Sequence, residues 1–288
     1  MSALAPSPSR RILTKGNEAI CLGAVAAGCR HYYGYPITPQ NDIPEYMAAH
    51  LPALGGTFLQ AESEVATINM MLGTSASGKR VMTSSSGPGI SLMQEGLSYM
   101  AGSELPAVIV NISRSGPGLG GIAPSQGDYF QAVKGGGHGG YRLIVLAPHS
   151  VQEMYALTML AFDLADKYRT PAMILGDAVV GQMKEPFVAS PYDPASTVEK
   201  PWALTGCVGR ERLNVKSLHL KDNAIERKNR RDTRLGQVIL GLALFCLWEF
   251  GSGVIVDQFF VSKPSQIVLS IWGMLIKEDL LYHMQFTV

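Results

Sequence analysis

Apolar residues between Gly16 and about Ala178 follow two alternating patterns along the chain. Stretches with apolar residues three or four positions apart predict helices, and short runs rich in Val, Ile and Tyr predict strands. Glycine or proline punctuates the changes from one pattern to the other. The predicted helices cover about 17–29, 40–49, 62–77, 89–101 and 150–168, and the predicted strands lie near 31–35, 57–60, 81–84, 107–111, 142–146 and 172–175.

This alternation of strands and helices predicts a fold of the α/β class. Because a helix connects each strand to the next, we expect a Rossmann-like parallel sheet with helices on both faces. Residues 14–190 are assigned to this domain. Residues 114–127 and 134–140 are too rich in glycine for core elements. We expect them to form long loops at strand ends, where α/β folds place their binding residues.

The local composition changes after Pro186. Residues 191–231 are predicted to form a basic linker or arm, since 199–234 hold ten Lys and Arg against five Asp and Glu. A solvated arm is favoured over a patch that binds nucleic acid or membrane, because aromatic residues are nearly absent among the charges.

Residues 232–288 are predicted to form an apolar tail whose fold the pattern does not define. Residues 238–256 are strongly apolar and reach the lower length limit of a membrane span. Glu249 places a charge inside this stretch, which favours a buried or misfit segment over a span, although the basic run 227–234 argues for a membrane. The tail is a natural extension, the product of an altered reading of the coding region, or a membrane-docking segment.

Charge and cysteine content exclude several classes of protein. The chain has 24 Lys and Arg against 23 Asp and Glu, so no basic field is available for binding nucleic acid. Its four cysteines, Cys21, Cys29, Cys207 and Cys246, have no C-x-x-C spacing, and no metal site is expected. Because the first sixteen residues contain no apolar leader, we expect reduced thiols and a cytoplasmic location.

One glycine motif is discounted. Residues 116–121 formally match G-x-G-x-x-G after a predicted strand. A dinucleotide fingerprint needs a helix to begin within the glycines, and here the sequence continues as a loop. The chain also lacks a G-x-S-x-G elbow and a Walker sequence, which excludes the hydrolases and P-loop enzymes that depend on them.

Two other motifs gain meaning from their spacing. Gln60-Ala61-Glu62-Ser63-Glu64 opens a predicted helix in which Val65, Ile68 and Leu72 recur at core-facing spacing. A predicted strand then ends in the turn Ser86-Gly87-Pro88-Gly89, with Gly87 placed 23 residues after Glu64. Together they resemble the pyrimidine-binding domain of thiamine-diphosphate enzymes, in which a glutamate at a helix start precedes a Ser-Gly-Pro-Gly turn.

Further motifs resemble one family of such enzymes, the α subunits of 2-oxoacid:ferredoxin oxidoreductases, and most of all the branched-chain (2-oxoisovalerate) type. The likeness runs from about Gly16 to Met183, and more loosely through Trp202 to about Asn229. The motifs that carry it are Gly34-Tyr35-Pro36-Ile37-Thr38-Pro39, Asn111-Ile112-Ser113-Arg114, Pro124-Ser125-Gln126-Gly127-Asp128-Tyr129 and Lys134-Gly135-Gly136-Gly137-His138-Gly139.

The resemblance implies a hetero-oligomeric enzyme that converts a 2-oxoacid, coenzyme A and oxidised ferredoxin to acyl-CoA, carbon dioxide and reduced ferredoxin. Thiamine diphosphate would be shared with a β subunit, which would also supply the magnesium site that this chain lacks. Iron–sulfur clusters would lie on a ferredoxin-like partner subunit, because the chain has no cluster cysteines. A branched-chain 2-oxoacid is the expected substrate, with 2-oxoglutarate and pyruvate as alternatives.

The resemblance also implies roles for residues near the cofactor. Glu64 would hydrogen-bond N1′ of the aminopyrimidine, with Glu62 as the competing assignment and an ordinary first-turn helix acid as the alternative. The turn Gly87, Pro88 and Gly89 would let the backbone approach the pyrimidine, because glycine has no Cβ.

For the substrate, the resemblance implies Thr38 and Arg114. A planar guanidinium can hold a carboxylate through two parallel N–H bonds, which sets orientation as well as affinity. A turn residue and a surface arginine are the alternatives. His138 is a further candidate for contact with the substrate, and its alternative is a histidine that only caps backbone groups.

A rival function from another class is a truncated, non-catalytic subunit that binds a β subunit or a membrane through the apolar tail. Recovery in a salt-washed membrane pellet would favour this rival. Reduction of ferredoxin that depends on a 2-oxoacid would favour the enzyme.

Overall fold

The computed structural model describes residues 11–193, 198–209, 224–252 and 262–276. The chain divides into two compact units, with the boundary between Ile225 and Glu226. The first unit carries every strand that the described residues form, and the second consists of most of one long helix and a shorter one.

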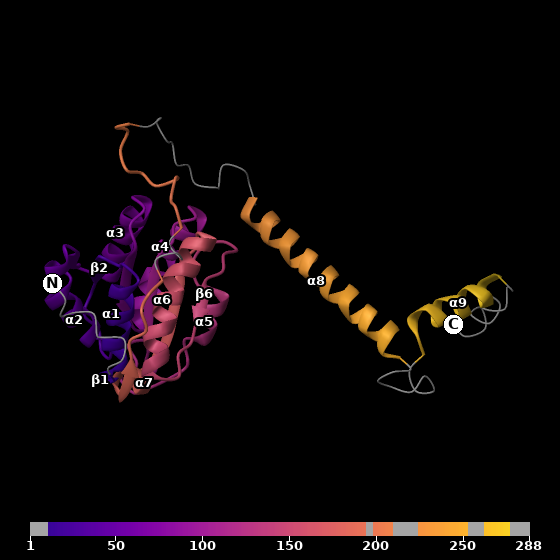
Figure 1. The fold of residues 1–288 in the computed structure, drawn as a ribbon, viewed down its shortest axis with the longest axis horizontal. Helices are drawn as coiled ribbons and strands as arrows, with labels where there is room; N and C mark the ends of the chain where they lie inside the picture. The colour runs from indigo at the N-terminus through magenta and orange to yellow at the C-terminus, as the bar shows by residue number, and fades with distance from the viewer. Residues whose placement is uncertain (1–10, 194–197, 210–223, 253–261, 277–288) are drawn as a thin grey trace. The chain divides into compact units, whose positions relative to one another are not determined.

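A six-stranded sheet forms the centre of the first unit, in the order β3-β2-β4-β5-β7-β6 (Figure 1). All neighbouring strands run parallel, which confirms the predicted α/β class. The strands are β2 (His31–Gly34), β3 (Thr57–Gln60), β4 (Val81–Ser85), β5 (Val108–Ser113), β6 (Ile144–Leu146) and β7 (Ala172–Asp177).

Helices cover both faces of this sheet, as predicted. On β5, Val110 and Ile112 belong to one buried apolar cluster and Ile109 to the other, because successive side chains of a strand point to opposite faces. A strand that is covered on both faces has a nearly continuous run of apolar residues, as β5 has from Val108 to Val110. The first cluster includes α1 (Gly16–Ala26), α2 (Asp42–His50) and α6 (Val151–Tyr168), and the second includes α3 (Glu64–Ala76), α4 (Gly87–Gly102) and α5 (Tyr129–Lys134).

One predicted core position is wrong. Val65 is 44% exposed, whereas Ile68 on the same helix is buried. Val65 lies in the first turn of α3, and in that turn the buried positions are Glu64 and Thr67. A favourable spacing alone therefore did not place Val65 in the core.

Several short elements complete the unit and were not predicted. They are α5, η1 (Pro52–Leu54), α7 (Ala178–Gln182) and an antiparallel pair made by β1 (Arg11–Lys15) and β8 (Lys184–Val188). This pair joins segments near the two ends of the predicted domain, 14–190, through the register Arg11 to Val188.

A cluster of charges around Arg80 ties the segment after β8 to the domain. The Arg80 side chain is 7% exposed, and it pairs with Asp163 and Asp166 at 2.8 Å each. Tyr192 donates a hydrogen bond to Asp163 at 2.7 Å, and Lys200 pairs with Asp166 at 2.6 Å. We call these five residues the Arg80 cluster.

The next residues of the segment also pack on the domain. The Arg169 guanidinium lies 4.6 Å from the centre of the Trp202 ring, and the Leu204 amide donates to the Ala76 carbonyl at 2.8 Å. The prediction of a solvated arm is therefore wrong for 200–204, because a buried carboxylate and an aromatic ring hold these residues in place.

The second unit contains most of α8 (Ala224–Gly251) and α9 (Pro264–Ile276). Glu249 accepts hydrogen bonds from the Ser265 amide at 2.9 Å and from its hydroxyl at 2.6 Å. Contact with α9 is made at the last turns of α8, so the apolar side chains from Leu235 to Leu247 are exposed within their unit. Residues 233–251 are long and apolar enough to cross a membrane.

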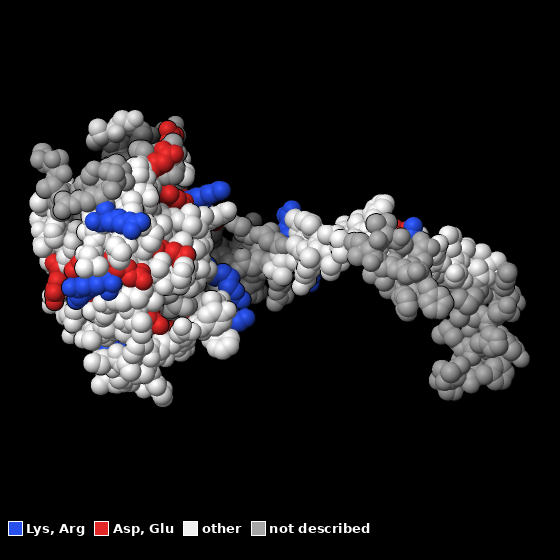
Figure 2. Space-filling model, turned by 60° about the horizontal axis from the view of Figure 1, so that its bottom comes forward, with Lys and Arg blue, Asp and Glu red and all other residues white. Residues whose placement is uncertain are grey.

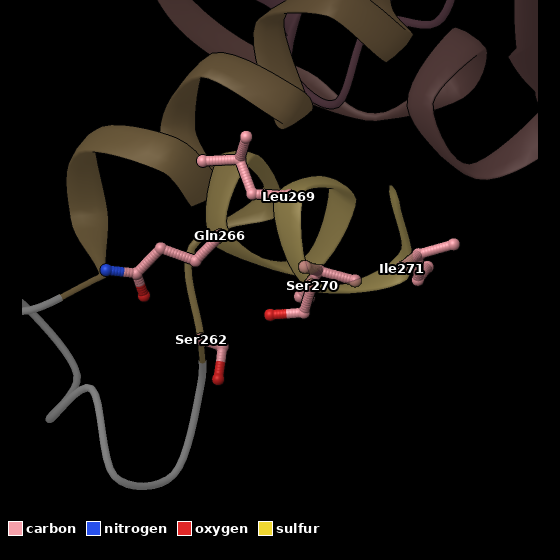
Figure 3. A pocket seen from close by; sticks show the side chains of 6 residues that line it. Ser262, Gln266, Leu269, Ser270 and Ile271 are labelled. Atoms are coloured by element: carbon pink, nitrogen blue, oxygen red, sulfur yellow. The ribbon is translucent and has the colours of Figure 1, made fainter. Parts of the chain in front are cut away.

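An open hollow of about 550 Å³ runs along α9 (Figure 3). Its side chains are hydroxyl, amide or aliphatic, and none of them is charged or titrates near neutral pH. Its described lining residues therefore offer no group for acid–base or metal chemistry. The lining residues are Ser262, Gln266, Ile267, Leu269, Ser270 and Ile271.

Charged side chains are mixed by sign on the surface of the first unit. On the face that Figure 2 shows, Lys and Arg alternate with Asp and Glu over the domain, without one large patch of a single sign. A mixed surface of this kind does not attract a polyanion by a long-range field.

Candidate functional site

The candidate residues gather where the parallel strands end. Thr38 follows β2, Glu64 follows β3, Gly87 follows β4 and Arg114 follows β5. Because β2, β3, β4 and β5 are parallel neighbours, their carboxyl ends form one edge of the sheet. This edge is where open α/β sheets bind their ligands.

Glu64 begins α3 and is 5% exposed. The hydroxyl of Ser63 caps the helix by accepting from the Ala66 amide at 3.2 Å, which fixes the point where the helix begins. Glu62, the competing candidate, is exposed. The structure therefore separates the two acids: Glu64 is packed into the edge and Glu62 faces solvent.

The Glu64 carboxylate lies directly against the start of α4. A Cβ placed on Gly89 would lie 2.5 Å from Glu64 Oε1 and 2.0 Å from Ser85 Oγ. Neither distance is tolerable between non-bonded atoms, so glycine is required at position 89. The predicted turn and the predicted carboxylate thus touch, although they come from different helices.

The start of α4 has polar groups without partners. Ser86 is the residue before the helix, yet its side chain makes no capping hydrogen bond. The hydroxyls of Ser85 and Ser86 are buried and have no hydrogen-bond partner among the described residues. Leaving a buried polar group unpaired costs about 1–3 kcal/mol, so these groups fit a polar ligand beside Glu64. An aminopyrimidine ring meets this requirement.

Arg114 follows β5 and is 8% exposed. Its Nη1 donates to the Thr38 carbonyl and its Nη2 to the Leu119 carbonyl, both at 2.9 Å. Its Nε is buried without a partner among the described residues. A guanidinium has five N–H donors, so this side chain keeps donors for a carboxylate. The hydrogen bond from Arg114 to the Thr38 carbonyl thus places the two residues side by side. This is the arrangement expected if both contact the same substrate.

A buried hydrogen-bond chain holds the loop that carries Thr38. The Tyr32 hydroxyl lies 2.6 Å from Ser84 Oγ, and Ser84 donates to Gln40 Oε1. The Gln40 amide nitrogen in turn donates to the Tyr35 carbonyl at 3.3 Å. Burial raises the pKa of Tyr32, so its hydroxyl stays protonated. Sequence reasoning missed this chain, because its members lie on β2, β4 and the loop between β2 and α2.

The same loop is anchored from the other side by Asp42. This carboxylate pairs with Lys15 at 2.7 Å and accepts from Asn17 at 3.0 Å and from Gln182 at 2.6 Å. Burial alone would raise the pKa of Asp42, but these three donors outweigh it and hold the pKa below its usual value. Asn17 and Gln182 also donate to the Pro39 carbonyl, at 3.0 and 2.9 Å. The residue after Thr38 is therefore held from two helices.

Asn111 and Asp128 also meet at this edge, and sequence reasoning gave neither a role. Asn111 lies on β5 and is fully buried, and Asp128 directly precedes α5. Asn111 Nδ2 donates to Asp128 Oδ2 at 3.0 Å. Both residues lie inside motifs that carry the family resemblance. Their place in these motifs is the sequence signal that could have indicated a role for them.

The edge is also hollowed on the side of β7. A hollow of about 390 Å³ includes Ser113, whose hydroxyl is buried and has no partner among the described residues. The wall opposite β5 comes from the loop before α5. The lining residues are Ser113, Ser125, Gln126, Tyr129, Ala147, Pro148, His149, Leu175, Gly176, Asp177 and Val180.

His138 lies apart from the other candidates. Its side chain is exposed. A Cβ on the adjacent Gly137 would lie 2.2 Å from the Gln94 carbonyl oxygen, so this loop packs along α4 two turns beyond its start. No described contact joins His138 to Glu64 or Arg114, and its role stays a prediction. Among the described residues, no three His, Cys, Asp or Glu side chains are grouped to hold a metal ion.

The fold and this edge define an α/β domain of the cofactor-binding class, with a buried carboxylate and unpaired polar groups at one helix start. The profile of the family described as pyruvate flavodoxin/ferredoxin oxidoreductase, thiamine diphosphate-binding, matches residues 22–226, and the chain belongs to this family. The matched region contains every candidate residue and ends within the first turn of α8.

Two known relatives are similar over most of the first unit. The ketoisovalerate oxidoreductase subunit VorB of Methanothermobacter thermautotrophicus is 54% identical over 219 residues, covering 75% of this chain and 62% of VorB. The 2-oxoglutarate synthase subunit KorA of Archaeoglobus fulgidus is 48% identical over 189 residues, covering 65% of this chain and 54% of KorA.

A solved structure shows the same fold. The 2-oxoglutarate:ferredoxin oxidoreductase of Magnetococcus marinus, with 2-oxoglutarate, coenzyme A and succinyl-CoA bound, superposes with a TM-score of 0.61 at 38% identity. The match covers 63% of this chain and 32% of that one. The chain thus spans less than two thirds of the length of these relatives.

Proposed function

We propose that the chain is the α subunit of a 2-oxoacid:ferredoxin oxidoreductase that converts a branched-chain 2-oxoacid to its acyl-CoA and reduces ferredoxin. In this proposal the chain supplies the aminopyrimidine side of a thiamine-diphosphate site. A β subunit supplies the magnesium and diphosphate side, and a ferredoxin-like subunit carries the iron–sulfur clusters that accept the electrons.

The single observation that carries this proposal is the Glu64 carboxylate buried against Gly89. The helix start fixes this carboxylate at the edge of the sheet, in a position to form a hydrogen bond with a bound ligand. Ser85 and Ser86 add unpaired hydroxyls at the same place. A flat ring with ring nitrogens and an amino group suits this set of donors and acceptors.

When bound, thiamine diphosphate supplies the nucleophilic carbon that attacks the 2-oxo carbon of the substrate. Glu64 holds a proton between its carboxylate and N1′ of the pyrimidine ring, which sets the tautomer of the ring. Arg114 receives the substrate carboxylate through its free N–H donors, and the Thr38 hydroxyl stands beside it. Gly87 and Gly89 keep the backbone close to the ring, because no Cβ intervenes.

The choice of a branched-chain substrate is supported by the identities to the relatives. The chain is 54% identical to a subunit named for ketoisovalerate and 48% identical to one named for 2-oxoglutarate. Pyruvate differs from 2-oxoisovalerate only in hydrocarbon groups, each of which changes binding by only about 1–3 kcal/mol. Pyruvate and 2-oxoglutarate, the substrate for which KorA is named, must therefore be assayed beside 2-oxoisovalerate.

A partner subunit is supported by the apolar surface around the carboxyl edge. Leu92 on α4, Leu119 and Ile122 on the loop after β5, and Tyr129 and Phe130 on α5 are each more than half exposed. Exposed apolar side chains grouped near a site are typical of protein interfaces. We therefore place the β subunit over this edge, where it completes the site.

The proposal is tested by co-expressing the chain with a β subunit and a ferredoxin-like subunit. Reduction of a viologen dye is then followed as a function of 2-oxoisovalerate and coenzyme A. Glu64→Gln is expected to lower turnover by at least a hundredfold while the subunits still assemble. Glu62→Gln is the matched control, two residues earlier and exposed, and it is expected to keep wild-type turnover.

Failure with every 2-oxoacid, despite an assembled complex that contains the cofactor, would contradict the proposal. Equal rates for the Glu64→Gln and Glu62→Gln variants would require another residue for the role of Glu64. A preference for 2-oxoglutarate or pyruvate would change the substrate and leave the reaction class intact.

Membrane attachment through α8 is a second candidate function. The apolar residues of 233–251 are exposed within their unit, and Arg231 and Arg234 stand at the start of the stretch. Apolar residues on all sides of a helix, with basic residues at one end, suit a bilayer. Recovery in the pellet after a carbonate wash would support attachment, and recovery in the supernatant would refute it. A chain ending at Asn229 is the matched control.

A further inference from the structure

Asn111 and Asp128 join the two ends of the loop that covers Arg114. The loop leaves β5 after Arg114 and returns to Asp128, and Asn111 Nδ2 donates to Asp128 Oδ2 at 3.0 Å across this gap. The Ser115 amide also donates to the Ala123 carbonyl at 2.9 Å, so the loop is closed on itself. The position of Arg114 is therefore coupled to Asp128 through the loop.

The side chain of Asp128 does not cap α5, the helix that it precedes. An aspartate at this position usually caps the helix, but the Asp128 side chain makes no capping hydrogen bond to α5. Asp177, in the same position before α7, does cap, by accepting from the Val179 and Val180 amides at 2.9 and 3.0 Å. The Asp128 carboxylate is instead directed to the edge of the sheet.

That carboxylate lies beside the start of α4. A Cβ on Gly87 would lie 3.7 Å from Asp128 Oδ2 and 4.0 Å from Arg114 Cγ. An anion is stabilised at the start of a helix, because the first backbone N–H groups carry partial positive charge. The Asp128 carboxylate therefore lies at the point where α4, β5 and the loop meet.

An ionised carboxylate only accepts hydrogen bonds, which fixes the orientation of the Asn111 amide. Nδ2 must face Asp128, so Oδ1 must face the other way. Asn111 Oδ1 is buried and has no partner among the described residues, as is true of Arg114 Nε. The acceptor Asn111 Oδ1 on β5 and the donor Arg114 Nε directly after β5 are therefore both buried and unpaired among the described residues.

We propose that Asp128 is a positioning residue, which fixes Asn111 so that Oδ1 accepts a hydrogen bond from an N–H or O–H group of the bound ligand. Arg114 Nε provides the complementary donor for a carboxylate. This inference rests on the proposed function and adds a second contact to its site. The donor is the amino group of the aminopyrimidine, because an ionised 2-oxoacid carries only oxygen acceptors and cannot donate to Oδ1.

The test uses the assembled enzyme with Asp128→Asn, Asn111→Ala and both together. Asn at position 128 can still accept from Asn111 and hold the loop, but it can also present its own N–H groups, which frees the Asn111 amide to turn over. Thiamine-diphosphate affinity is measured by quenching of protein fluorescence, and the KM for 2-oxoisovalerate is measured separately. Melting temperatures report on stability.

We expect each single change to weaken the affinity for thiamine diphosphate at least tenfold, with little change in melting temperature. The double variant is expected to be no weaker than either single one, because both remove the same contact. A loss of cofactor affinity supports the contact with the aminopyrimidine, and a loss confined to the KM for 2-oxoisovalerate would contradict it. Glu153→Gln, another acid at the carboxyl edge, is the control and is expected to change neither constant.

Two further results would overturn the inference. One is a pair of single variants that keep both constants within twofold of wild type. The other is a double variant whose loss equals the product of the single losses, since independent effects would show that Asp128 does not act through Asn111. Asn111→Ala keeps the test decisive if Asp128→Asn fails to assemble. A wild-type assembly that binds neither ligand would instead refute the proposed function, and this inference with it.

Discussion

Replacing Gly89 with alanine probes the closest contact of the site. The added Cβ would lie 2.5 Å from Glu64 Oε1, and ordinary contact begins at 3.4 Å, so the carboxylate oxygen must move by about 0.9 Å. A shift of about 1 Å in a catalytic group costs about a hundredfold in rate. We therefore expect Gly89→Ala to lower turnover of the assembled enzyme by about that factor.

The effect on stability is expected to be much smaller. Overpacking a core costs about 1–3 kcal/mol, and alanine gains up to about 1 kcal/mol over glycine inside a helix. The net loss of about 0–3 kcal/mol lowers the melting temperature by no more than about 12 °C, since each kcal/mol shifts a domain of this size by about 2–4 °C. Activity and stability should therefore separate.

Two other glycines provide matched controls. A Cβ on Gly73 of α3 meets nothing within 4 Å, so Gly73→Ala should stabilise the protein slightly and leave turnover unchanged. A Cβ on Gly96 of α4 would lie 2.4 Å from Ile68 Cγ2, so Gly96→Ala should lower the melting temperature and spare turnover. Wild-type turnover in Gly89→Ala would refute the reasoning, because Glu64 would then not need its present position.

Three further results follow from the structure. Arg80→Ala should lower the free energy of unfolding by about 3–5 kcal/mol in denaturant titrations, because it removes the buried cation shared by Asp163 and Asp166 and leaves Lys200 as the remaining cation; a loss below 1 kcal/mol would contradict this. The pKa of Asp42 lies below its usual 3.8, so Asp42→Asn should cost stability at pH 7, and the difference from wild type should shrink as the pH falls below about 4. Burial raises the pKa of Cys29 to about 12, so iodoacetamide at pH 8 should label the exposed Cys207 and Cys246 in the native protein and leave Cys29 unlabelled, as read by mass spectrometry.

Local sequence patterns predicted most of the central sheet, because its strands and helices differ clearly in hydrophobic period. The strand at 57–60 was predicted with both ends correct. The helix predicted from 62 begins at Glu64, since Ser63 takes an extended backbone and caps it. The pairing of β1 with β8 was missed, because it joins segments that are far apart in the sequence and each is too short to show a period.

The candidate site was predicted in part, and the missing part depends on three-dimensional contacts. The motifs indicated Glu64, Gly89 and Arg114, but the choice between Glu64 and Glu62 needed their burial. The pairing of Asn111 with Asp128 joins a strand to a distant loop end, and no spacing rule reports it. Unpaired atoms, such as Ser85 Oγ, become visible only when every neighbour is known.

The Arg80 cluster also determines where the polypeptide departs from the domain. Arg80 directly precedes β4, and Ala76, which binds Leu204, ends α3, so both belong to the amino ends of the strands. The ligand edge is at the opposite ends of the same strands. A protein fused after residue 209 would therefore start from the back of the domain, and a reporter or affinity handle attached there should leave the mouth of the site open.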